Sequence, residues 1–146
     1  MPSDLARILV PSDFRAPADG AVTFAKTLAQ TFGASLHVIH VLEDPTMDDI
    51  ASAERLVDIQ LTAEERRQLR ATTVVLRGDT APTIVSYAEL HGIDLIVMGT
   101  EGRSRRGLPG GLLEQVARLG PCPVLTYTAR IERPLTSNGH AASTFV

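Results

Sequence analysis

Short runs of apolar residues recur along the chain, and their composition restricts the folds that it can adopt. Several of these runs are apolar at every position rather than at every second position. That pattern is typical of strands covered on both faces, as in a parallel sheet. The predicted strands cover residues 8–10, 36–42, 73–76, 95–98 and 124–127.

The segments between these strands have the helical period instead. Their apolar residues fall three and four positions apart, which predicts helices over residues 21–32, 50–61, 81–88 and 112–119. Gly33, Gly92 and Pro121 follow three of them as stop signals. A charged stretch, 64–67 with Arg70, is interpreted as the solvated end of the second helix, with ion pairs between residues three apart. The alternation predicts a three-layer α/β domain with a five-stranded, mostly parallel sheet.

Composition limits what such a domain can do. A chain of 146 residues predicts one domain, over 1–129, and an aperiodic tail, 130–146, that we expect to be flexible or to act as an oligomer arm. The net charge of −3 argues against nucleic-acid binding, which needs a basic face. The single cysteine fits a reducing compartment, and no apolar run approaches the roughly 18 residues of a membrane helix. With no signal peptide visible, we expect a cytoplasmic protein without membrane partners.

Two unusual sequences directly follow predicted strands. The first strand runs into residues 11–14, Pro-Ser-Asp-Phe, and the fourth runs into a loop, 99–111, that contains five glycines. Ligands of open α/β sheets bind beyond the carboxyl ends of the strands, where the strand order reverses. If both sequences are functional, the first and fourth strands are neighbours, which selects the strand order 3-2-1-4-5.

The loop 99–111 is the strongest candidate for a phosphate site. Its glycines can turn backbone N–H groups toward one point, and it opens a helix whose N-terminus carries partial positive charge. Arg103, Arg105 and Arg106 add formal charge. A loop with solvated arginines is an equally good interpretation of composition alone. The chain has neither a P-loop nor a dinucleotide fingerprint, and the residues around Ser104 do not complete a nucleophile elbow.

Asp13, the four histidines and the single cysteine are the remaining candidate site residues. Asp13 is either a ligand to an amine or cation, or a turn and helix-cap residue, and the residues alone favour the second. His37 and His40 are three apart on a strand and point to opposite faces, so no histidine metal site is expected. Cys122, between two prolines, is interpreted as a packing residue rather than a reactive thiol.

The motifs taken together resemble the universal stress protein family over most of the chain, about residues 7–128. The resemblance rests on residues 7–14, on His40-Val41 and Gly78-Asp79, on 94–104, and on 121–125. It implies a Rossmann-like domain with the strand order 3-2-1-4-5. It also implies a homodimer, commonly formed through the last strand, and a role in stress survival with a protein partner that the sequence does not identify.

The nucleotide-binding branch of that family has the pattern G-x-x-G, nine residues, then G-[ST]. Gly99 and Gly102 match its first part, but only seven residues separate Gly102 from Gly110, and Gly111 stands where a hydroxyl residue would meet phosphate. The resemblance implies ATP or AMP as ligand, with Mg²⁺ accompanying ATP and no intrinsic metal. The implied contacts are Asp13 and the Val41 backbone with adenine; Pro11, Ser12, Met98 and Gly99 with the nucleoside; and Gly102, Arg103, Gly110, Gly111 and Leu112 with phosphate.

Three functions stay open at this level. The first is a nucleotide-binding stress module, and the second is a member of the non-binding branch that acts through protein contacts alone. The third is a weak phosphohydrolase, for which only Glu101 and Asp13 are candidate bases. No nucleophile with an adjacent base and no paired carboxylates are visible, so we expect no enzyme activity beyond slow ATP hydrolysis.

Overall fold

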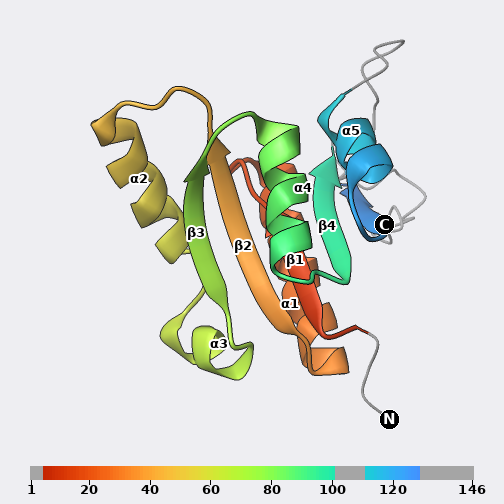
Figure 1. Cartoon of the computed structure of the whole chain (residues 1–146). Helices are drawn as coiled ribbons and strands as arrows, with labels where there is room; N and C mark the ends of the chain where they lie inside the picture. Colours follow the sequence, from red (N-terminus) through yellow and green to blue (C-terminus); the bar gives the residue numbers. More distant parts are fainter. Residues whose placement is uncertain (1–4, 101–110, 129–146) are drawn as a thin grey trace, which may run out of the picture.

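The computed structural model describes residues 5–100 and 111–128. Helices and strands alternate along them, as the periodicity predicts (Figure 1). No helix within these two ranges combines the length and the hydropathy that crossing a bilayer requires. The elements are β1 (Arg7–Pro11), α1 (Ala16–Phe32), β2 (Ser35–Leu42), α2 (Met47–Asp58), α3 (Ala63–Gln68), β3 (Thr72–Arg77), α4 (Thr80–Leu90), β4 (Leu95–Thr100), α5 (Leu112–Leu119) and β5 (Val124–Thr128).

The five strands form one sheet in the order β3-β2-β1-β4-β5, and every pairing is parallel. This confirms the strand order expected from the two candidate loops. β1 is the centre of the sheet, because Ile8 lies opposite Leu36 of β2 on one side and Leu95 of β4 on the other. The two loops that follow β1 and β4 therefore leave the sheet at neighbouring positions on one edge.

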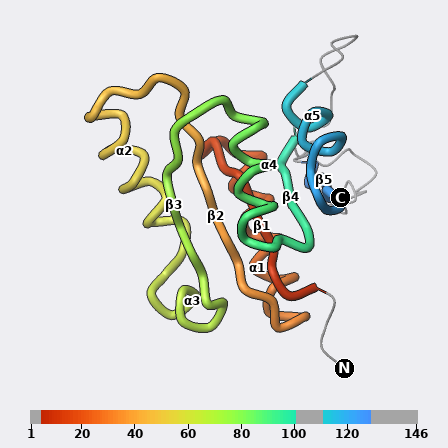
Figure 2. Tube along the Cα trace, viewed as in Figure 1, coloured from red at the N-terminus to blue at the C-terminus, as the bar shows by residue number. Residues whose placement is uncertain are grey.

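Helices cover both faces of this sheet, so the domain has the three predicted layers (Figure 2). α1 packs on one face with alanines and small apolar residues, and α4 and α5 pack on the other face. Tyr127 of β5 lies over Gly20 of α1, where a Cβ would overlap its ring, and its ring centroid is 5.8 Å from that of Phe24. The core beneath α1 includes Ile8, Val10, Ala21, Val22, Ala25, Leu36, Val38 and Val97, and the core beneath α4 and α5 includes Leu9, Ile39, Ile84, Ala88, Ile96, Met98 and Val116.

The prediction of a single helix over 50–61 with a charged end was wrong. The structure has α2, which ends at Asp58, and a separate helix α3. The break arises because Thr62 caps α3: its hydroxyl accepts the Glu65 N–H at 3.0 Å, and Glu65 Oε1 accepts the Thr62 N–H at 2.9 Å. This capping box starts a new helix whatever precedes it.

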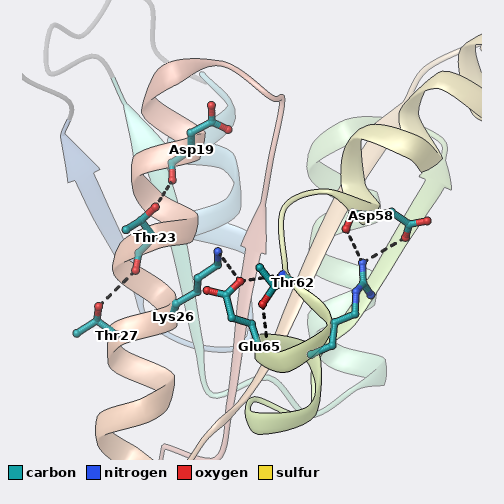
Figure 3. A network of polar contacts seen from close by, with 8 residues as sticks. Asp19, Thr23, Lys26, Thr27, Asp58, Thr62 and Glu65 are labelled. Carbon is teal, nitrogen blue, oxygen red and sulfur yellow. Dashed lines mark hydrogen bonds and ion pairs between the residues drawn. The ribbon is translucent and has the colours of Figure 1, made fainter.

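Charged side chains of α3 fix it to its neighbours (Figure 3). Glu65 also accepts from Lys26 of α1 at 3.1 Å, and Arg66 lies 3.3 Å from the Asp58 carboxylate. The expected pair three residues apart is present between Glu64 and Arg67, at 3.5 Å and exposed. The last pair contributes little to stability, since exposed ion pairs are worth about 0–1 kcal/mol.

A group of rings lies near the start of β2, far along that strand from the carboxyl edge of the sheet. His37 is buried, and its Nδ1 is 2.7 Å from the Tyr87 hydroxyl of α4. His91, the C-cap of α4, stacks on Tyr87 with centroids 3.9 Å apart. Burial first, then the nearby His91 and Arg7, lower the pKa of His37 below its ordinary value of 6.5.

We therefore predict that the free energy of unfolding falls as the pH drops below 6.5, the ordinary pKa of histidine. The unfolded chain binds a proton at His37 at a higher pH than the folded chain, so acid favours unfolding in that window. Denaturant unfolding between about pH 7.5 and pH 5.5 measures the effect, and His37→Asn should flatten the slope. An unchanged slope in that variant contradicts the assignment. Carboxylates titrate below this pH window and do not cause the slope; the pKa of Glu65, for example, is lowered from an ordinary value of 4.5.

Candidate functional site

A cleft of about 720 Å³ opens at the carboxyl edge of the sheet, between the ends of β1 and β4. The start of α1, the N-terminus of α4 and the N-terminus of α5 complete its walls. Gly102, Arg103 and Gly110, like Glu101, lie outside the described residues. The other eight candidate residues all line this one cleft, namely Pro11, Ser12, Asp13, Val41, Met98, Gly99, Gly111 and Leu112.

The turn after β1 carries Asp13 into the cleft. Ser12 is 4% exposed, and its N–H extends the pairing with β2 by donating to the Ile39 carbonyl at 2.8 Å. Its hydroxyl accepts the Phe14 N–H at 3.1 Å, and Asp13 Oδ1 accepts the Arg15 N–H at 2.9 Å. Asp13 is thus a turn residue, as its type alone suggests. A carboxylate has two oxygens with about four acceptor positions, so the turn does not exhaust its capacity for a ligand.

His40 fixes this turn from β2 and is a site residue that sequence reasoning missed. Its Nδ1 lies 2.6 Å from the Ser12 carbonyl oxygen, and its ring centroid is 4.3 Å from that of Phe14. The motif His40-Val41 is visible in the sequence, but nothing local indicates that the imidazole reaches a carbonyl 28 residues away. Thr80 and Ile84 of α4 and Thr126 and Thr128 of β5 were also missed, because only the tertiary fold brings them to the cleft.

Close packing explains why residue 99 is a glycine. A Cβ at this position would overlap the Pro17 carbonyl and come within 2.8 Å of the Ala18 nitrogen. The end of β4 and the first turn of α1 therefore touch through backbone atoms. Pro17, Ala18 and Gly99 all line the cleft, so this contact forms part of its wall.

The N-terminus of α5 faces the cleft with backbone atoms. Its N-cap, Gly111, has φ −60° and ψ 165° and provides no side-chain cap. Leu112, Leu113 and Glu114 of the first turn line the cleft with it. A helix N-terminus presents unpaired N–H groups and a partial positive charge, which suit a phosphate or another anion.

At the N-terminus of α4, a side chain from another part of the chain accepts hydrogen bonds. Glu43, directly after β2, accepts from the Thr80 hydroxyl at 2.8 Å and from the Thr80 N–H at 3.2 Å. These two hydrogen bonds, the hydroxyl first, lower the pKa of Glu43. Glu43 and Asp79 line a second depression of about 490 Å³ that shares Thr80 and Leu112 with the cleft.

In the part of the chain that the structure describes, neither a cluster of metal ligands nor the single cysteine contributes to the cleft. Within residues 5–100 and 111–128, no group of three or more His, Cys, Asp or Glu side chains could hold a metal ion. Burial raises the pKa of the Cys122 thiol, and the partly buried side chain packs against the core beneath α4 and α5. Cys122 is therefore a packing residue, as its sequence context suggests.

The sequence and fold described above are similar to those of known proteins. The model of the universal stress protein family matches residues 5–128. A universal stress protein of Methanocaldococcus jannaschii is 30% identical in an alignment 135 positions long, which covers 82% of this chain and 79% of the relative. The solved structure of a universal stress protein family member from Burkholderia pseudomallei is 25% identical, with a TM-score of 0.70, and covers 87% of this chain and 98% of its own.

A further solved structure contains a ligand. The universal stress protein of Archaeoglobus fulgidus in complex with dAMP has a TM-score of 0.64 at 22% identity, over 85% of this chain and 98% of its own. The family match to residues 5–128 covers every described residue and so all five strands of the sheet. The chain belongs to the universal stress protein family.

Proposed function

We propose that the cleft binds an adenine nucleotide, AMP or ATP, and that the protein is a nucleotide-dependent module of the stress response in the cytoplasm. The observation that carries the proposal is that one cleft joins Asp13, the end of β2 at Val41 and the first turn of α5. The dAMP complex of the Archaeoglobus fulgidus protein supports a ligand of this class. The proposed activity is binding, with ATP hydrolysis slow at most.

The cleft has separate surfaces for the parts of such a ligand. Val41, Ile84 and Met98 offer apolar contact to a flat base, and the Asp13 carboxylate accepts from its amino group. Pro11, Ser12 and Gly99 line the proposed nucleoside region. The proposed phosphate contacts are Gly111 and Leu112, with Gly102, Arg103 and Gly110 from outside the described residues, and Mg²⁺ accompanies ATP.

The first test is thermal unfolding with AMP and with Mg-ATP. A ligand at about 100 times its Kd adds roughly 2.7 kcal/mol, so the midpoint should rise by several degrees. Asp13→Ala and Asp13→Asn should both lose that rise. Asp13→Asn keeps an oxygen for the Arg15 N–H, so its midpoint without ligand should exceed that of Asp13→Ala. If neither nucleotide raises the unfolding midpoint of the unsubstituted protein, the proposal is wrong. The alternative is then the branch of the family that acts through protein contacts alone.

Gly111→Ser tests the phosphate end. The backbone angles at Gly111 admit any residue, and among the described residues an added Cβ would meet only Glu114 Oε1, at 3.8 Å. Isothermal titration should give an ATP affinity higher by up to about tenfold, the worth of one added hydrogen bond. Gly111→Ala adds the same carbon without the hydroxyl and should leave the affinity unchanged. An equal gain of ATP affinity in both variants would mean that the helix preference of the new residue, and not a contact with phosphate, causes the gain.

We also propose that two copies of the chain associate along β5. In the described sheet β5 is an edge strand; its Leu125 is 36% exposed, and Leu119, at the end of the preceding helix α5, is 52% exposed. An unpaired edge with apolar side chains favours pairing with a second copy.

Light scattering should give a dimer mass, and Leu125→Glu should lower it toward a monomer. Leu90→Glu, at a more exposed leucine on α4, is the matched control, and a monomeric unsubstituted protein overturns the proposal.

A further inference from the structure

The turn that carries Asp13 has an unfavourable backbone conformation. Phe14 has a φ of +66°, in the left-handed region that residues with a Cβ rarely adopt. Such a conformation persists only where surrounding contacts impose it. Within the turn, these contacts are the bonds of the Ser12 hydroxyl and the Asp13 carboxylate to the N–H groups two residues ahead.

From outside the turn, the Ile39 carbonyl accepts the Ser12 N–H, and His40 supplies two further contacts. Its Nδ1 is 2.6 Å from the Ser12 carbonyl oxygen, and its ring lies 4.3 Å from the Phe14 ring, centroid to centroid. A carbonyl oxygen only accepts, so Nδ1 carries the hydrogen and donates it. One side chain of β2 thus holds residues on both sides of Asp13, one by a hydrogen bond and the other by ring contact.

We infer that His40 is a positioning residue for the ligand: through Ser12 and Phe14 it holds the Asp13 carboxylate in the orientation that receives the base. The inference rests on the proposed nucleotide function. It makes His40 responsible for how precisely the Asp13 carboxylate is oriented in that site. The hydrogen bond contributes more to this positioning than the ring contact, because it fixes the Ser12 carbonyl in direction as well as distance. The ring contact limits the freedom of Phe14 in its unfavourable conformation.

The test separates the hydrogen bond from the ring. His40→Leu removes the donor. His40→Asn places an amide N–H at the position of Nδ1 and so keeps the donor while removing the ring. His37→Asn, on the same strand but bonded to Tyr87 instead of the turn, is the control for loss of an imidazole from β2. AMP affinity is measured by titration, and amide hydrogen exchange at residues 12–15 is measured without ligand.

We expect His40→Leu to weaken AMP binding about fivefold to tenfold and to speed exchange at residues 12–15, as the loss of one directional hydrogen bond predicts. His40→Asn should restore most of the affinity and of the protection, and His37→Asn should change neither. A His40→Leu variant that folds and binds AMP as the unsubstituted protein does overturns the inference. Equal impairment in the Leu and Asn variants also overturns it, because the hydrogen bond would then not be the cause.

The inference and the proposed function fail separately. If the unsubstituted protein does not bind AMP or ATP, the proposed function falls, and the exchange data alone decide whether His40 orders the turn. Should exchange at residues 12–15 be the same in the unsubstituted protein, the Asn variant and the Leu variant, the inference falls even where nucleotide binds. Unfolding midpoints of all four proteins, with the control included, identify a variant whose loss of binding reflects general unfolding.

Discussion

The position of β1 between β2 and β4 is the constraint on which the rest of the structure depends. Parallel strands direct all their carboxyl ends to one edge, and the chain leaves β1 and β4 for helices on opposite faces of the sheet. The described cleft opens at this point of the edge, between the ends of the two strands. Main-chain pairing of a few residues, Ile8 and Leu9 with Leu95 and Ile96, thus determines where the cleft lies.

The helices adjust the charge of that space. Both α4 and α5 contribute their N-terminal turns to the cleft, and each has an acidic side chain close by: Glu43 accepts from Thr80 at the start of α4, and Glu114 belongs to the first turn of α5. Asp13, from the turn after β1, lines the same cleft. A cleft that combines a carboxylate with a helix N-terminus suits the proposed ligand, which has a hydrogen-bonding base and a phosphate.

Much of this arrangement follows from the sequence. Apolar runs that do not alternate identify buried parallel strands, and the residues after the first and fourth runs are enough to select the strand order. The division of α2 from α3 was missed although its signal, Thr62 followed by Glu65 three residues later, is local and readable. The contact of His40 with Ser12 is of another kind, because its geometry exists only after β1 and β2 pair. Residues contributed by α4 and β5 were missed for the same reason.

The close approach at Gly99 has a consequence for how the domain tolerates mutation. Where β4 meets α1, the surfaces in contact are main chain, so most side-chain changes nearby leave the wall of the cleft in place. At residue 99 even a methyl group would overlap the backbone of the first turn of α1, so this part of the cleft wall depends on a glycine. A library designed to alter ligand preference would keep residue 99 as glycine, together with His40 and the turn that carries Asp13, and would vary the other side chains that line the cleft.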